Sequence, residues 1–175
     1  MRQLLASLVL FATAAAADLT TIPFKTITGK ETSLADYKGK VVLVVNTASK
    51  CGLTPQYAAL ETIYDKYRRK DFVVLAFPCN DFNGQEPGTE KEIKEFCKDK
   101  FDISFPLMEK VHVKGAEQHP LYAALSGKEG AFPGDVSWNF GKFLIGKDGK
   151  PLARFEPKTT PDSPEVTEAI EKALK

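Results

Sequence analysis

In the stretch VVLVVNTASKCGLT, residues 41–54, an apolar run stops at Asn46, and Cys51 follows after a short polar segment. In a thiol–disulfide oxidoreductase a second cysteine stands three residues after the first, but here that residue is Thr54. A thiol without a near partner can instead attack an O–O bond and become a sulfenic acid, which another thiol then reduces. Because Cys51 lies outside the apolar run, its position favours a reactive thiolate. An inert buried cysteine is the alternative interpretation.

The elements around Cys51 support a reactive site. Residues 41–47 read as a central strand buried on both faces, and residues 54–70 read as a helix. Thr54 is predicted to cap this helix and Pro55 to occupy its first position. Open α/β sheets place their sites at the carboxyl ends of such strands, and the amides of a helix N-terminus stabilise a thiolate.

The remaining pattern predicts further strands and helices in an alternating order. We expect a hairpin over 24–33, a second buried strand over 72–78, a weaker strand over 106–113, and two strands around a turn at 147–150. Helices are predicted after a capping box from Thr89 to Glu92, from about Pro120, and from Ser163-Pro164. The order predicts an α/β protein of thioredoxin-like type, with a mixed central β-sheet flanked by helices and an N-terminal β-hairpin.

The length and composition of the chain predict one compact domain that acts on a small or neutral partner. The 175 residues include 24 Lys and Arg against 23 Asp and Glu, and no basic block that would indicate nucleic acid. Residues 1–17 have the charged start, short apolar run and small residues of a signal peptide, with cleavage after Ala17. We therefore expect one domain over 18–175, exported to the periplasm or secreted, without stable membrane insertion. A disordered or membrane-held N-terminus is the alternative.

Three separated stretches, NTASKCGLT, LAFPCNDFNGQEPGT and WNFGKFL, resemble the signature stretches of the glutathione peroxidase family. The resemblance extends from about Phe24 to the last predicted helix, and it implies a thioredoxin-like fold that reduces hydrogen peroxide and organic or lipid hydroperoxides. Cys51 stands at the position of the family's peroxidatic cysteine or selenocysteine. Gln85, Trp138 and Asn139 match the residues that surround it, and their amide and indole N–H groups can polarise the reactants.

The resemblance also implies a second redox cysteine. Thioredoxin-dependent, non-selenium members carry a resolving cysteine in the helix after the QEPG loop, where this chain has Cys97. The implied cycle forms a Cys51–Cys97 disulfide that a thioredoxin-like protein reduces, and it requires local opening of that helix. Cys97 also falls on a stripe with Ile93, Phe96 and Lys100, so it can instead be a core residue, with glutathione reducing Cys51 directly. The sequence is also compatible with a redox relay to a partner protein and with a plain binding module.

Several polar residues remain outside this scheme. Cys79 is interpreted as a small residue packed at a strand end, and His119 as a helix-entry residue. Neither histidine is placed as a base for Cys51, and no metal-ligand spacing is present, so no cofactor or metal is expected. Asp81 stands where family members commonly have Gln; its carboxylate could disfavour the thiolate, repel anionic peroxides or point to solvent. The resemblance to compact members further implies a monomer with an open face around Cys51.

Overall fold

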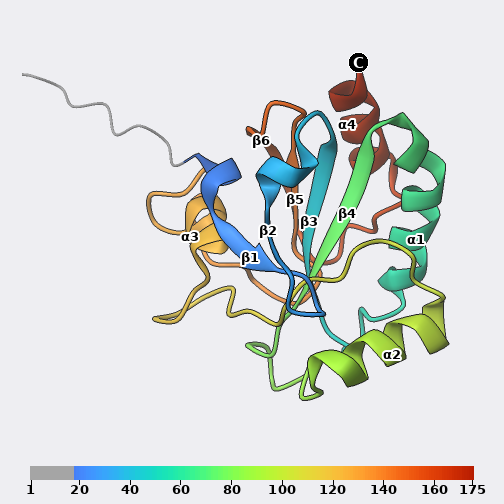
Figure 1. The fold of residues 1–175 in the computed structure, drawn as a ribbon, viewed down its shortest axis with the longest axis vertical. Helices are drawn as coiled ribbons and strands as arrows, with labels where there is room; N and C mark the ends of the chain where they lie inside the picture. Colours follow the sequence, from blue (N-terminus) through green and yellow to red (C-terminus); the bar gives the residue numbers. More distant parts are fainter. Residues whose placement is uncertain (1–17) are drawn as a thin grey trace, which may run out of the picture.

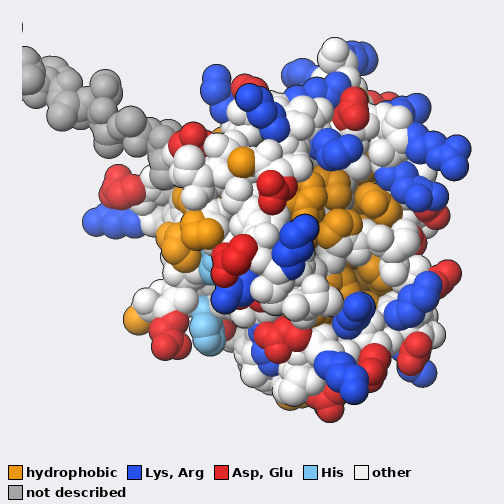
Figure 2. All heavy atoms as spheres, in the orientation of Figure 1, with side chains coloured by type: hydrophobic (Ala, Val, Ile, Leu, Met, Phe, Trp, Pro, Cys, Tyr) orange, Lys and Arg blue, Asp and Glu red, His pale blue; other side chains and the backbone are white. Residues whose placement is uncertain are grey.

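The computed structural model describes residues 18–175, so the predicted signal peptide over 1–17 lies outside the described residues. Among the described residues, no helix combines the length and the apolar character that crossing a bilayer requires. Basic and acidic side chains are interspersed over the face seen in Figure 2, which accords with the near balance of charges in the sequence.

The centre of the molecule is a four-stranded sheet with the order β4-β3-β5-β6 (Figure 1). Its strands are β3 (Val41–Thr47), β4 (Phe72–Pro78), β5 (Lys142–Ile145) and β6 (Pro151–Phe155). β3 pairs in parallel with β4 and antiparallel with β5, and β5 pairs antiparallel with β6. The predicted mixed sheet is therefore confirmed.

Helices cover one face of this sheet and a helix with the N-terminal hairpin covers the other. Successive residues of β3 alternate between two apolar clusters, with Leu43 in one and Val44 in the other. The first cluster includes residues of α1 (Gln56–Tyr67) and α4 (Pro164–Leu174). The second includes residues of α3 (Pro120–Ser126) and β1 (Pro23–Lys25). Because both faces are covered, every residue of β3 and β4 is buried.

The N-terminal hairpin joins β1 to β2 (Glu31–Ser33), and it contacts the main sheet through residues 106–109. The Ile27 amide donates to the Leu107 carbonyl at 2.9 Å, and the Met108 amide donates to the Ala76 carbonyl of β4 at 2.8 Å. The strand predicted over 106–113 is wrong, because this segment forms only isolated bridges on each side. Pro106 lacks an amide donor, so it cannot contribute a full ladder of hydrogen bonds.

Helix boundaries follow the predictions at α2 and depart from them at α1. α2 (Glu90–Phe101) begins with the predicted capping box: the Glu92 amide donates to the Thr89 hydroxyl, and the Thr89 amide donates to the Glu92 carboxylate at 2.8 Å. α1 begins only at Gln56, with Pro55 at its N-cap and a 3₁₀ turn, η3 (Arg68–Lys70), after its end. The predicted Thr54 cap is wrong, because its hydroxyl is used elsewhere. The short turns η1 (Leu19–Thr21) and η2 (Leu34–Tyr37) lie near the hairpin.

Candidate active site

Cys51 lies in a tight loop between β3 and α1, with 9% of its surface exposed. Its Sγ accepts a hydrogen bond from the Leu53 amide at 3.4 Å. Its own amide donates to the Thr54 hydroxyl at 3.0 Å, and that hydroxyl donates to the Ala48 carbonyl at 2.8 Å. Thr54 therefore fixes the Cys51 loop instead of capping α1, and the thiol sits at the boundary between core and surface.

Gln85 and Asn139 are joined to each other and to the Cys51 loop. The Lys50 amide donates to the Gln85 carbonyl at 3.0 Å, and Asn139 Nδ2 donates to Gln85 Oε1 at 2.9 Å. The Cys51 loop follows β3, Gln85 follows β4 and Asn139 precedes β5. Because β5 runs antiparallel to β3, its beginning lies at the same edge of the sheet as the ends of β3 and β4. The side-chain oxygen of Gln85 accepts the hydrogen bond from Asn139, so its side-chain N–H₂ group can donate to a reactant.

Trp138 lies beside the Cys51 loop. Its half-buried ring packs against the apolar cluster that contains Cys51, and the ring centroid of Phe82 is 5.4 Å away. Trp138 and Leu53 line a cavity of about 310 Å³, together with Ser137, Glu156, Pro157 and Lys158. All four predicted site residues thus come from loops at one edge of the sheet.

Two further residues, which sequence reasoning did not assign to the site, hold the segment that carries Trp138 and Asn139. Asn46 Nδ2 donates to the Trp138 carbonyl at 3.1 Å, and Lys142 Nζ donates to the Phe140 carbonyl at 2.6 Å. The sequence feature that could have indicated their role is their position, since Asn46 and Lys142 are polar residues within or beside an apolar strand. Both are fully buried.

Glu86 is a third residue missed by sequence reasoning. Its side chain is fully buried and accepts a hydrogen bond from the Ser49 hydroxyl, two residues before Cys51. Burial raises the pKa of this carboxyl, although the Ser49 bond opposes the shift. Lys110 Nζ holds the same loop by donating to the carbonyls of Glu86 at 3.3 Å and Gly88 at 2.6 Å. The loop that carries Gln85 is therefore anchored on two sides.

Cys97 lies on α2 and is completely buried in the apolar cluster that includes Cys51. Burial raises the pKa of its thiol to about 11. Ile93 is buried and Phe96 is half-buried on the same helix, but Lys100 is exposed, so the predicted stripe ends at Cys97. The three cysteines, all within residues 18–175, are free thiols. A cavity of about 240 Å³ reaches Cys97 between α2 and residues 103–107.

Cys79 and Asp81 follow β4 but have other surroundings. Cys79 is fully buried, and burial raises the pKa of its thiol to about 12. Asp81 accepts a hydrogen bond from the Val113 amide at 2.7 Å and pairs with His112 Nδ1 at 2.6 Å. Burial alone would raise the pKa of Asp81, but these bonds lower it overall. The interpretation that Asp81 points to solvent is wrong, because its side chain is only 8% exposed.

His119 occupies the predicted helix-entry position, since its Nδ1 accepts a hydrogen bond from the Leu121 amide at the start of α3. Within residues 18–175, no group of His, Cys, Asp and Glu side chains is arranged to hold a metal ion.

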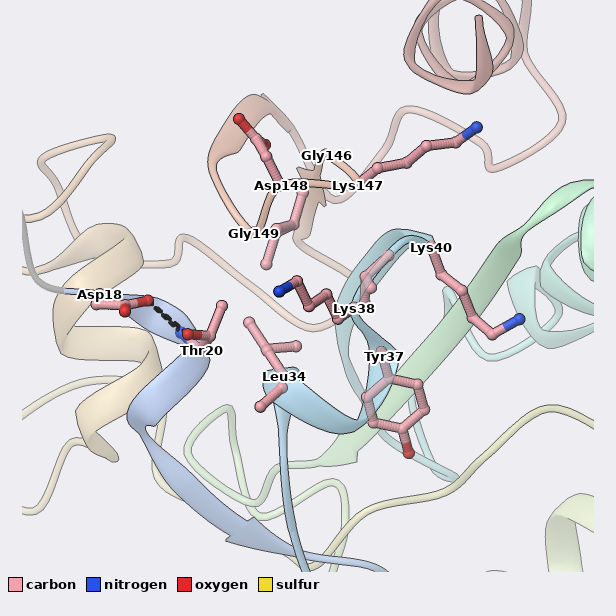
Figure 3. A pocket seen from close by; sticks show the side chains of 13 residues that line it. Asp18, Thr20, Leu34, Tyr37, Lys38, Lys40, Gly146, Lys147, Asp148 and Gly149 are labelled. Carbon is pink, nitrogen blue, oxygen red and sulfur yellow. Dashed lines mark hydrogen bonds between the residues drawn. The ribbon is translucent and has the colours of Figure 1, made fainter.

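A separate cavity of about 320 Å³ lies near the amino end of β3, away from Cys51 (Figure 3). Figure 3 shows the Lys38 side chain directed between Leu34 and Gly149, whereas Lys40 and Lys147 extend away from the centre. Lys147 Nζ instead donates to the Leu174 carbonyl at 2.9 Å. No cysteine lines this cavity, so it is not part of the thiol site.

Comparison with known proteins gives a consistent result. The family model described as glutathione peroxidase matches residues 19–126, which is more than half of the chain. The thioredoxin/glutathione peroxidase BtuE of Escherichia coli is 43% identical over 177 aligned positions, covering 89% of this chain and 96% of BtuE. The hydroperoxy fatty acid reductase Gpx2 of Synechocystis is 54% identical over 135 positions, covering 77% and 85%. The crystal structure of apo Trgpx superposes with a TM-score of 0.73 at 39% identity, covering 91% and 97%.

Proposed function

The chain belongs to the glutathione peroxidase family and is a thiol peroxidase acting on hydroperoxides, and we propose that Cys51 is its peroxidatic residue. The observation that carries this assignment is the junction of three loops at one sheet edge. There the Cys51 loop bonds to Gln85, and Gln85 bonds to Asn139. Trp138 completes the site from the side of the adjoining cavity.

In the first step the Cys51 thiolate attacks the O–O bond of the hydroperoxide. One oxygen is transferred to sulfur, giving the sulfenic acid, and the other leaves as an alcohol, or as water from hydrogen peroxide, after taking a proton. The Gln85 and Asn139 amides and the Trp138 indole supply neutral N–H donors. They orient the peroxide and stabilise developing charge, but they are too weakly acidic to act as the proton source, so solvent supplies the proton.

In the second step we propose that Cys97 resolves the sulfenic acid. Its thiol attacks the Cys51 sulfur, which forms a disulfide and releases water, and a thioredoxin-like dithiol then reduces the disulfide by exchange. The name of the E. coli relative supports thioredoxin as a reductant. Because Cys97 is completely buried, this step requires local opening of α2.

The full burial of Cys97 also favours a second candidate, in which Cys97 is structural and glutathione reduces Cys51 directly. Peroxide consumption by wild type and Cys97→Ser, with thioredoxin and with glutathione, separates the two. Loss of the thioredoxin-supported rate alone supports Cys97 as resolver, whereas an unchanged rate with both reductants assigns it to the core. Cys79→Ser is the matched control, because it alters another buried thiol outside the cycle. Wild type in which Cys51 is not oxidised by peroxide would refute the assignment of Cys51.

We further propose that the protein acts on bulky hydroperoxides, is exported and is a monomer. The Synechocystis relative is named for hydroperoxy fatty acids, which supports bulky lipid hydroperoxides as substrates beside hydrogen peroxide. The N-terminal residue pattern supports export, and the resemblance to compact family members supports a monomer. Mass spectrometry of the exported chain should find Asp18 at its N-terminus, and light scattering should give the mass of one chain.

A further inference from the structure

Lys142 is a lysine in an unusual place, the first residue of the central strand β5. It is paired with Val45 of β3 and Phe155 of β6, and its side chain is fully buried. Its Nζ donates to the Phe140 carbonyl at 2.6 Å and to the Pro157 carbonyl at 3.3 Å. A buried lysine that bonds two backbone carbonyls fixes the chain segments to which those carbonyls belong.

The segment held in this way has a strained backbone. Phe140 has a φ of 68°, in the left-handed region that residues with bulky side chains rarely adopt. Its amide donates to the Asn46 carbonyl at 2.6 Å, while its carbonyl receives the Lys142 bond. Its ring is buried 5.5 Å from the ring of Tyr57. Such a conformation persists only where surrounding contacts enforce it, and it commonly occurs at functional sites.

The two residues before this strained position are Trp138 and Asn139. Asn46 also bonds the Trp138 carbonyl, so the backbone from Trp138 to Phe140 is held by β3 on one side and by Lys142 on the other. Release of the Phe140 carbonyl would remove one of the contacts that enforce this φ, and the residue could then relax toward an unstrained conformation. That relaxation would move the Asn139 side-chain amide away from Gln85, with which it shares a 2.9 Å bond.

We propose that Lys142 is a positioning residue of the peroxidase site: its amino group holds the strained turn at Phe140 and thereby keeps Trp138 and Asn139 against the Gln85 and Cys51 loops. The inference rests on the proposed function of Cys51. Lys142 itself touches no reactant; it acts through the backbone of the residues that do.

The test uses Lys142→Met, which keeps the chain length but removes every donor, and Lys142→Gln, which keeps an amide donor on a shorter chain. Lys150→Met is the matched control, because Lys150 lies in the β5–β6 turn with its side chain 79% exposed. Stopped-flow mixing gives the rate constant for oxidation of reduced protein by hydrogen peroxide, and dithiothreitol gives the rate of re-reduction. Trp138 is the single tryptophan, so its emission reports directly on the held segment.

We expect Lys142→Met to lower the oxidation rate constant at least tenfold and to shift the Trp138 emission, while re-reduction by dithiothreitol is unchanged. Lys142→Gln should fall between Lys142→Met and wild type, and Lys150→Met should match wild type. A folded Lys142→Met protein with the wild-type oxidation rate and emission overturns the inference.

If Lys142→Met does not fold, Lys142→Gln decides, and a wild-type oxidation rate in that variant overturns the inference equally. Failure of wild type to oxidise Cys51 would refute the proposed function instead. The emission spectra would still test whether Lys142 holds the segment, and unchanged emission in both variants would overturn that claim.

Discussion

Replacing Lys142 by Met should change how the stability of the fold depends on pH. Burial lowers the pKa of Lys142 from 10.5 to about 7, because the ammonium loses its hydration, although nearby Glu156 opposes the shift. Between these two pH values the unfolded chain binds more protons than the folded chain, so the free energy of unfolding rises with pH. Below pH 7 the full penalty for burying the charge applies, on the order of 5 kcal/mol relative to pH above 10.5.

The measurable part of this effect lies between pH 6 and pH 9. With the two pKa values above, linkage gives a gain of about 2.5 kcal/mol for wild type over that interval, which Lys142→Met lacks. At pH 9 the variant should be the less stable protein, because the Phe140 carbonyl loses its bond from Nζ. At pH 6 this deficit should shrink by about 2.5 kcal/mol or reverse.

Urea unfolding under reducing conditions, followed by circular dichroism at both pH values, measures the difference. The buried thiols Cys79 and Cys97 titrate in both proteins, so their contributions cancel when wild type is compared with the variant. Lys150→Met should differ from wild type equally at both pH values. If the stability difference between wild type and Lys142→Met changes by less than about 0.5 kcal/mol between pH 6 and pH 9, the reasoning about a buried, deprotonating lysine is refuted.

Three other substitutions test the contacts around the site. Asp81→Asn should lower the free energy of unfolding by about 1–2 kcal/mol at pH 6 but by less at pH 3. The lowered pKa of Asp81 means that its carboxylate stabilises the fold above the unfolded-state pKa of 3.8, and this stabilisation is lost as the pH falls through the folded-state pKa. Equal shifts of the urea midpoint at both pH values would contradict this prediction. Thr54→Ala leaves the Cys51 amide and the Ala48 carbonyl without the Thr54 hydroxyl, so it should lower the free energy of unfolding by about 1–3 kcal/mol and slow the oxidation of Cys51 by peroxide. Thr54→Ser should restore the stability, measured by thermal melts, and the oxidation rate, measured by stopped flow. Thr89→Ala removes the capping box and should lower the free energy of local opening of α2 by about 1 kcal/mol, which speeds amide exchange in its first turns about fivefold. Unchanged exchange would show that tertiary packing alone sets the stability of α2.

The sequence predicts an element well where one physical cause dominates. β3 and β4 match the predicted ranges because burial on both faces produces continuous apolar runs that end where burial ends. The capping box of α2 is equally local, since both of its hydrogen bonds join residues three positions apart. The turn between β5 and β6 carries Asp148-Gly149, and Gly149 adopts a φ of 80° that favours glycine.

Prediction fails where a side chain has a choice of partners. Thr54 before a proline is a typical helix cap, yet its hydroxyl instead bonds two backbone groups of the Cys51 loop, the Cys51 amide and the Ala48 carbonyl. Asp81 gives no local sign that its carboxylate binds residues 112–113, more than 30 positions later. Lys142 interrupts an apolar run, but only the strained turn of Phe140 explains what its amino group holds.

The location of Cys97 connects folding stability with the proposed turnover. The packing that buries Cys97 on α2 keeps its thiol protonated, since burial raises its pKa to about 11. Burial and protonation of the Cys97 thiol both oppose its attack on the Cys51 sulfenic acid. Opening of α2 would remove both, because an exposed thiol returns toward its ordinary pKa and is free to move. The stability of α2 should therefore limit the resolution step while leaving the first oxidation of Cys51 unchanged. Thr89→Ala should then speed disulfide formation without changing the oxidation rate, and slower disulfide formation would show that a closed α2 is the reactive form.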